Sequence, residues 1–239
     1  MPDGYTFCVY LSDTVVINPS AYKKLPYSPA DFTPVAQLAR IDAAVVVSAE
    51  LPIKSIADLA KYDAANPGKL SWGPFGVGSS SHLCMTKVNS QLGTKFFDIP
   101  YQGGGPTMNG LLSGQVQASL LSYGLVSQHI DQGKLRAIGV LGDKSSPRFA
   151  GVPLLKDLGF GYSPQSWIGM FAPAGTSVAI VDRVNKEVKT ALQDPELIKA
   201  LESQGLAPSP MTPQELDTQV KADLAEWSAL VKAANISLD

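Results

Sequence analysis

Cysteine and histidine are nearly absent from this sequence, which holds Cys8, Cys84, His82 and His129 and no others in 239 residues. Two cysteines are too few for a disulfide framework or a metal site, and two histidines cannot supply a histidine-based metal cluster. Cys8 lies in a strand-like run and Cys84 in a predicted helix, so we expect two buried free thiols. We predict neither a metal nor a cofactor.

Charge is also sparse. Charged residues make up 17% of the chain and the formal net charge is -2, whereas globular proteins average about a quarter charged residues. Nothing indicates a basic face for nucleic acid. No apolar run approaches the ~20 residues of a membrane span. The start, Met-Pro-Asp-Gly-Tyr, has no basic region followed by an apolar one, so we predict no signal peptide in this chain.

What is present is a full apolar core, with 45% hydrophobic residues. Strand-like runs alternate with helical patterns, which predicts a mainly parallel α/β sheet. The run Tyr5–Leu11 is predicted to be a buried strand, too apolar for a solvent edge. From Thr176 onward the chain is predicted to be nearly all helical. The last predicted helix has one apolar face, formed by Leu216, Val220, Leu224, Trp227 and Val231.

The most informative stretch runs from Leu70 to His82, with the sequence LSWGPFGVGSSSH. It predicts a short strand, a glycine-rich turn and the start of a helix capped by serine. The spacing of Gly73 and Gly78 is that of a phosphate-binding P-loop, but Ser79 stands where that loop needs lysine. The stretch therefore favours a neutral anion cradle suited to a carboxylate. The alternative is a tight strand-to-helix turn with no ligand.

Several phrases, in order along the whole chain, resemble one family, the solute receptors of tripartite tricarboxylate transporters, often called Bug receptors. The phrases are Pro2-Asp-Gly-Tyr-Thr6, Ile17-Asn-Pro19, Tyr22-Lys-Lys-Leu-Pro26, Asp31-Phe-Thr-Pro34, Asn66-Pro-Gly-Lys-Leu70, Gly76-Val-Gly-Ser-Ser-Ser-His82, Pro100-Tyr-Gln-Gly-Gly104, Gly133-Lys-Leu-Arg-Ala137, Trp167-Ile-Gly169 and Ala172-Pro-Ala-Gly-Thr176.

The resemblance implies an α/β protein with a two-lobed fold like that of the type II periplasmic binding proteins and with a hinged cleft. It places residues 1–43 and 167–239 in a first lobe and residues 44–166 in a second, with crossings near Ile41–Ala44 and Ser166–Ile168. It implies an extracytoplasmic, periplasmic receptor that captures a small carboxylate or a related organic solute and passes it to membrane subunits. It implies no enzymatic activity.

The sequence also departs from the family pattern. Members usually begin with a secretory signal and two β–α units, about 60 residues, which this sequence does not contain, so we expect an incomplete first lobe. Leu121 stands where aspartate is common and Gln102 where lysine is common. Both differences favour a ligand other than a simple dicarboxylate.

An incomplete lobe leaves open an alternative in which the chain is a truncated, oligomerising receptor fragment without ligand-binding activity. Unpaired groups beside Tyr5–Leu11 would favour strand addition by another chain. We therefore expect a homodimer or a swapped assembly.

Candidate ligand-binding residues follow from the resemblance and from strand ends, where the clefts of open α/β folds form. They are Ser12, Thr14, Phe75, Gly76, Val77, Gly78, Ser79, Ser80, Tyr101, Ser122, Tyr123 and Trp167. Plain structural roles remain open for several of them. Tyr101 could be an ordinary half-buried aromatic residue and Trp167 a plug at the hinge. His82 is expected to pack or to form local hydrogen bonds, with ligand contact as the alternative.

A third reading is an esterase or a cysteine-dependent hydrolase, which needs a base beside serine or cysteine. Cys84 and His82 are two residues apart on a predicted helix, so their side chains do not face each other. The sequence therefore gives this enzyme reading little support.

Overall fold

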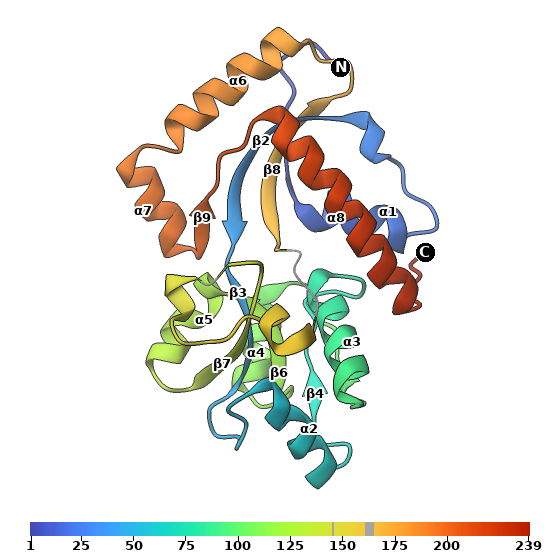
Figure 1. Cartoon of the computed structure of the whole chain (residues 1–239), viewed down its shortest axis with the longest axis vertical. Coiled ribbons are helices and arrows are strands. Elements are labelled where there is room, and N and C mark those ends of the chain that lie inside the picture. Colours follow the sequence, from blue (N-terminus) through green and yellow to red (C-terminus); the bar gives the residue numbers. More distant parts are fainter. Residues whose placement is uncertain (145, 161–164) are drawn as a thin grey trace. The chain divides into compact units, whose positions relative to one another are not determined.

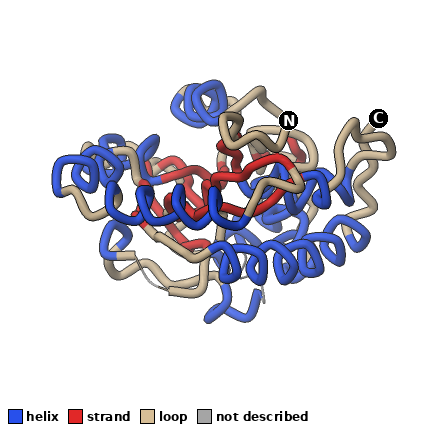
Figure 2. Tube along the Cα trace, turned by 90° about the horizontal axis from the view of Figure 1, so that it is seen from above, coloured by secondary structure: helices blue, strands red, loops and turns tan. Residues whose placement is uncertain are grey.

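The computed structural model describes residues 1–144, 146–160 and 165–239. The chain divides into two compact units, each built from its own sheet and helices (Figure 1). Unit 1 comprises Met1–Ile41 and Ser166–Asp239, and unit 2 comprises Asp42–Gln165. Figure 2 marks the strands in red and the helices in blue. The α/β fold class predicted from the sequence is confirmed.

Unit 1 contains a four-stranded sheet in the order β1-β8-β2-β9, in which every neighbouring pair is antiparallel. Its strands are β1 (Cys8–Leu11), β2 (Phe32–Ile41), β8 (Trp167–Pro173) and β9 (Leu206–Pro208). Its helices are α1 (Asn18–Ala21), which follows a π-helical turn over Asp13–Ile17, α6 (Val178–Ala191), α7 (Pro195–Ser203) and α8 (Pro213–Ala233).

The sequence explains the two long helices of unit 1. Helix α8 begins with a complete capping box, in which Thr212 and Glu215 satisfy each other's backbone N–H groups. Its buried face includes Leu216, Val220 and Trp227 as predicted. Leu224 is only half-buried, and the next position on the buried face is Asp223. Helix α6 packs through its valine stripe onto β2 and β8.

Unit 1 contains one long strand that the sequence did not predict, and one expectation for it was wrong. Strand β2 is ten residues long and was missed, because Pro34 interrupts the strand pattern and marks an irregularity in the pairing with β8. Strand β9, three residues long, lies within the region that was predicted to be nearly all helical. Strand β1, predicted to be too apolar for a solvent edge, lies at a sheet edge, with Val9 and Leu11 55% and 51% exposed. Its alternating exposure belongs to a strand buried on one face only.

Unit 2 contains a five-stranded sheet in the order β5-β4-β6-β3-β7. Its strands are β3 (Ala43–Ser48), β4 (Ser71–Trp72), β5 (Phe97–Asp98), β6 (Ala118–Ser122) and β7 (Leu135–Leu141). Its helices are α2 (Ile56–Ala65), α3 (Ser80–Leu92), α4 (Gly104–Leu112) and α5 (Tyr123–Asp131).

The unit 2 sheet is mixed, which corrects the prediction of a mainly parallel sheet. Strand β4 is parallel to β5 and β6, whereas β3 is antiparallel to both β6 and β7. The predicted strand over residues 96–101 shortens to β5, Phe97–Asp98. Alternation of strands and helices along the sequence does not itself fix strand direction, because β3 enters the sheet between strands that come later in the chain.

The core of unit 2 lies where α4 and α5 cover the sheet. Ala44 and Val46 of β3 pack there with Met108, Leu111 and Val126. Leu121 of β6 belongs to the same buried cluster and is 1% exposed. The leucine at this position therefore contributes to the core.

Both cysteines are free thiols, as expected. Cys84 on α3 is buried, and this burial raises the pKa of its thiol to about 12. Cys8 on β1 is only half-buried, which corrects the expectation of two buried thiols.

Candidate functional site

Three helices of unit 2 begin at one edge of its sheet. Strands β4, β5 and β6 are parallel to one another within the sheet. Each is followed by a helix, β4 by α3, β5 by α4 and β6 by α5. Because parallel strands end at the same edge, the starts of the three helices gather there. Ligands of open α/β sheets bind outside such carboxyl ends, and helix starts present unpaired N–H groups to an anion.

The glycine–serine stretch forms the first of these connections. Gly78 has φ +75°, a left-handed conformation that suits glycine. Gly73 lies so close to its neighbours that an added Cβ would come within 2.9 Å of Val116. Ser79 is the N-cap of α3, and its hydroxyl oxygen accepts from the N–H of His82 at 3.4 Å. The strand, turn and capped helix predicted from the sequence are all present.

The loop is closed by hydrogen bonds to the first turn of α3. The hydroxyl of Ser79 donates to the carbonyl of Gly76 at 2.6 Å, and the backbone N–H of Ser79 donates to the same carbonyl at 3.3 Å. The N–H of Gly78 donates to Nδ1 of His82 at 3.1 Å. His82 therefore forms local bonds, as expected.

These bonds determine which amides are left to receive a ligand. Across the described ranges, the N–H groups of Phe75, Gly76 and Val77 have no hydrogen-bond acceptor. Gly76 is half-buried and Val77 is exposed, so an anion can reach them. Gly78 and Ser79 were predicted to share in the cradle, but their amides already have partners within the loop.

Two further serines begin helix α3. Ser80 is buried, with 2% of its surface exposed, and has an interaction of its own within the structure. The hydroxyl of Ser81 is buried and meets no hydrogen-bond partner among the residues described. Both side chains therefore lie beneath the loop surface.

The connection from β5 to α4 lies beside the loop. The N–H of Tyr101 donates to the carbonyl of Pro74 at 2.9 Å, and that of Gly103 donates to the carbonyl of Phe75 at 2.9 Å. The starts of α3 and α4 are thus held together through backbone bonds. Gln102, between the two donors, is exposed.

The side chain of Tyr101 runs toward the far end of α4. Its hydroxyl donates to Oε1 of Gln115 at 2.9 Å, and an added Cβ on Gly110 would lie 2.1 Å from that hydroxyl. Burial raises the pKa of Tyr101. These contacts agree with the alternative of a half-buried aromatic side chain, and a ligand contact for Tyr101 stays a prediction.

Ser122 and Tyr123 stand at the junction of β6 and α5. Ser122 is the N-cap residue of α5, but its side chain makes no capping bond. The ring of Tyr123 packs edge-on against Phe149 at 5.4 Å, and the guanidinium of Arg148 lies 5.9 Å from its centroid. Arg148 is paired in turn with the buried carboxylate of Asp42. Tyr123 is thus packed into this part of unit 2, and a ligand contact for either residue stays a prediction.

The remaining predicted residues, Ser12, Thr14 and Trp167, belong to unit 1 and bond within it. The hydroxyl oxygen of Ser12 accepts from the N–H of Trp167 at 3.3 Å. The carbonyl of Thr14 accepts from the hydroxyl of Tyr27 at 2.8 Å. The indole of Trp167 donates to Asp223. Their roles as ligand contacts also stay predictions.

Two ionisable residues that contact His82 and Trp167 were not predicted from the sequence. Asp98 ends β5, and its Oδ2 lies 3.4 Å from Nε2 of His82. Burial lowers the pKa of His82, and Asp98 opposes that shift. Asp223 is 4% exposed, and burial raises its pKa against the lowering effect of its bond from Trp167. The position of Asp223 on the buried face of α8 was the sequence signal that could have identified it as a buried carboxylate.

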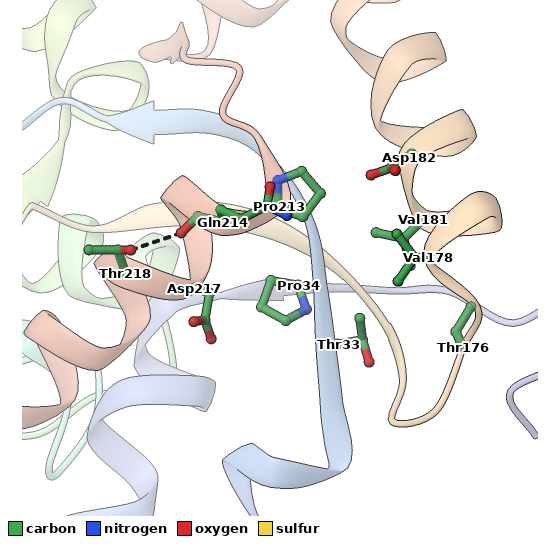
Figure 3. Close-up of a pocket in the computed structure, with 10 residues that line it drawn as sticks. All are labelled: Thr33, Pro34, Thr176, Val178, Val181, Asp182, Pro213, Gln214, Asp217 and Thr218. Atoms are coloured by element: carbon green, nitrogen blue, oxygen red, sulfur yellow. Dashed lines mark hydrogen bonds between the residues drawn. The ribbon is translucent and has the colours of Figure 1, made fainter.

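A separate open pocket of about 420 Å³ lies in unit 1 between β2, α6 and the start of α8 (Figure 3). The residues that line it are Thr33, Pro34, Thr176, Val178, Val181, Asp182, Pro213, Gln214, Asp217 and Thr218. None of the predicted ligand-binding residues is among them. Two carboxylates on its wall disfavour an anionic ligand, so the helix starts of unit 2 remain the better candidate site.

Within the described residues, His, Cys, Asp and Glu do not form a group of three or more that could hold a metal ion. Among the helices that the structure describes, none is both long enough and apolar enough to cross a membrane.

Comparison with known proteins gives a family for this arrangement. The family model described as "Tripartite tricarboxylate transporter family receptor" matches residues 1–236. A UPF0065 protein of Cupriavidus necator is 36% identical over 220 residues, which are 90% of this chain and 65% of that protein. BugT of Bordetella pertussis is 28% identical over 239 residues, 99% of this chain and 73% of the relative. The chain thus spans about two thirds of the length of such relatives.

Solved structures agree. The periplasmic binding protein BugD is 30% identical, with a TM-score of 0.85 over 99% of this chain and 80% of that one. A Rhodopseudomonas palustris protein solved with adipate is 30% identical, with a TM-score of 0.88 and the same two coverages. MatC from Rhodopseudomonas palustris, solved with malate, is 26% identical, with a TM-score of 0.82 over 97% of this chain and 80% of that one. The chain belongs to the tripartite tricarboxylate transporter receptor family.

Proposed function

We propose that this protein is an extracytoplasmic receptor that captures a small organic acid in the periplasm for the membrane subunits of a tripartite transporter. The observation that carries the proposal is the set of unpaired amides of Phe75, Gly76 and Val77 at the start of α3. We assign these amides to one carboxylate of the solute. Family members solved with adipate and with malate support an organic acid as the ligand class.

The chemistry of the loop fits a carboxylate better than a phosphate. Residues 73–81 contain no lysine, arginine or histidine, so within the loop the positive potential comes from backbone dipoles. Amides at a helix start favour an anion by about 0.3–1 kcal/mol through the helix dipole, apart from direct hydrogen bonds. This suits a singly charged group, whereas a triphosphate needs cationic side chains and a metal.

The residue types at two positions bear on the choice of acid. Leu121 is buried in the core of unit 2, so its side chain offers a ligand no polar contact. Gln102 is exposed beside the loop and carries an amide without charge. We therefore expect the solute to present one carboxylate to the loop and less charge elsewhere than a simple dicarboxylate has.

The proposed activity does not include catalysis. The thiol of Cys84 is buried and its pKa is raised to about 12, so a thiolate nucleophile is suppressed at neutral pH. The family is one of solute receptors. An esterase assay on the purified protein should therefore give no turnover above buffer.

We further propose that the protein self-associates through β1. This strand is at the edge of its sheet, and it exposes Val9 and Leu11 on one face. An open edge with apolar side chains favours strand addition by another chain. A symmetric pair of copies would close both edges.

Calorimetric titration tests the binding proposal, with adipate, malate and a panel of monocarboxylates as probes. Each acid is compared with its uncharged amide, which keeps the shape and removes the charge. Saturable heat for an acid, absent for its amide, is the expected result. Binding of the amides as tightly as the acids would contradict a carboxylate site, and so would the absence of binding for every acid in the panel.

A further inference from the structure

His82 joins the glycine–serine loop to the end of a neighbouring strand. Its Nδ1 accepts from the N–H of Gly78 at 3.1 Å, and its Nε2 lies 3.4 Å from Oδ2 of Asp98. The side chain of His82 is largely enclosed, with 13% of it exposed, whereas the side chain of Asp98 is 43% exposed. One ring therefore contacts both the loop before α3 and the carboxyl end of β5.

The two contacts specify the protonation state of the ring. A nitrogen that accepts a hydrogen bond must carry a lone pair, so Nδ1 has no proton. A neutral imidazole then carries its proton on Nε2, which faces the carboxylate of Asp98. A doubly protonated ring has donors at both nitrogens, and its Nδ1 would oppose the donor of Gly78.

We propose that neutral His82 is a positioning residue that holds the loop in its anion-accepting shape, and that protonation of His82 releases the loop. This rests on the proposed function, in which the amides of Phe75, Gly76 and Val77 receive a carboxylate. The release is local, because the bonds of Ser79 to Gly76 do not involve the Gly78 amide.

Gly78 is the residue that the release affects most. Its φ of +75° sets the direction of the chain between the three ligand-facing amides and the helix. Among the described residues, its N–H has His82 as its hydrogen-bond acceptor. Without that acceptor, the glycine gains access to other backbone conformations. The loop then loses one of the bonds that hold the three amides in one arrangement, while those to the carbonyls of Pro74, Phe75 and Gly76 remain. Binding must therefore supply part of the ordering.

The surroundings of His82 place the release at acidic pH. Burial lowers the pKa of the ring below its usual 6.5, and Asp98, the charged group that faces it, opposes the shift. The bond to Gly78 is therefore intact at neutral pH and is lost at acidic pH, below the usual titration range of histidine. Carboxylic acids with a pKa near 4 keep most of their charge in the upper part of the acidic range, so loss of the loop shape can be separated from loss of ligand charge.

Hydrogen exchange at the Gly78 amide, followed by NMR without ligand, tests the bond itself. Protection is corrected for the intrinsic pH dependence of exchange. We expect protection at about pH 7.5 and its loss, on the order of tenfold, at about pH 5. His82→Asn keeps an acceptor oxygen near the position of Nδ1 but cannot titrate, so its protection should not change with pH. His82→Phe should lack protection throughout.

His129→Asn is the matched control, because it removes the other histidine and leaves the loop intact. Asp98→Asn removes the charge facing His82, so the pH of release should move lower. Protection of Gly78 that stays the same at both pH values in the wild type would overturn the proposal. So would protection that survives in a folded His82→Phe variant.

Affinity for adipate and malate, measured at both pH values, tests the link to binding. The wild type and His82→Asn should bind alike at about pH 7.5, and the wild type should be several-fold weaker at about pH 5. Equal pH profiles in the wild type, His82→Asn and His82→Phe would overturn the positioning role and leave the proposed function standing. If neither acid binds while Gly78 protection still follows His82, then the loop bond is supported and it is the proposed function that fails.

Discussion

The indole Nε1 of Trp167 donates a 2.7 Å hydrogen bond to Oδ2 of Asp223, and both side chains are buried inside unit 1. The other oxygen of Asp223 accepts from Nε2 of Gln219 at 2.7 Å. The bond connects the first residue of β8 with the middle of α8. A buried carboxylate with two donors is costly to leave partly unsatisfied.

Replacing Trp167 with phenylalanine should therefore lower the free energy of unfolding by about 1–3 kcal/mol beyond the loss of packing, because Asp223 loses a donor. Trp72→Phe is the matched control. Trp72 is also fully buried, and its Nε1 has no hydrogen-bond partner among the described residues. Urea denaturation of both variants measures the difference. Equal losses would show that the bond to Asp223 adds nothing to stability.

Asp223 should also make stability depend on pH. Burial raises its pKa above 3.8 in the folded protein, so the folded state binds this proton more tightly than the unfolded state does. The free energy of unfolding should accordingly fall as the pH rises from 3.8 through the raised pKa. Asp223→Asn removes this loss, so its difference from the wild type should shift in its own favour between about pH 3.5 and pH 7. A difference that is constant with pH would contradict the assignment.

Gly78 gives a direct test of the loop. Gly78→Val places a β-branched residue at φ +75°, which is strained, and should abolish carboxylate binding by distorting the loop. Gly114→Val is the matched control. Gly114 has φ +76°, with open space around an added Cβ, and lies after the end of α4. Both variants should lose similar stability, and only the first should lose binding in calorimetric titration. Unchanged binding in Gly78→Val would count against the loop as the site.

The sequence was sufficient for the loop because its determinants are local. Glycines, an N-cap serine and a helix pattern within Leu70–His82 specify the turn with no help from distant residues. The contact between His82 and Asp98 joins α3 to β5, and nothing in the spacing of the two residues reveals it. The bonds of His82 within its own turn were expected, but the link to a second strand was not.

The errors in the fold have physical reasons of the same kind. Strand β2 was not predicted because it contains Pro34, and proline cannot donate a hydrogen bond to a β-ladder. Pro34 is accommodated at an irregular point in the pairing with β8, which depends on tertiary structure. Strand direction in unit 2 depends on the insertion of β3 between β6 and β7. That insertion is determined by tertiary contacts and not by local sequence. Asp223 sits at helical spacing between Val220 and Trp227 on α8. The burial of Asp223 could have been predicted from its position on the apolar face of the helix.

The exposed edge of β1 supplies the last test. Val9→Lys places a charge on the exposed face of the edge strand, which natural sheets use to prevent pairing. If copies associate through β1, this change should shift the protein to a monomer of about 25 kDa. Val178→Lys is the matched control, because Val178 is 70% exposed but lies on α6. Light scattering after size exclusion, at micromolar concentration, measures the mass of each. A wild type that is already monomeric would contradict self-association, and a loss of association in both variants would place the contact elsewhere than β1.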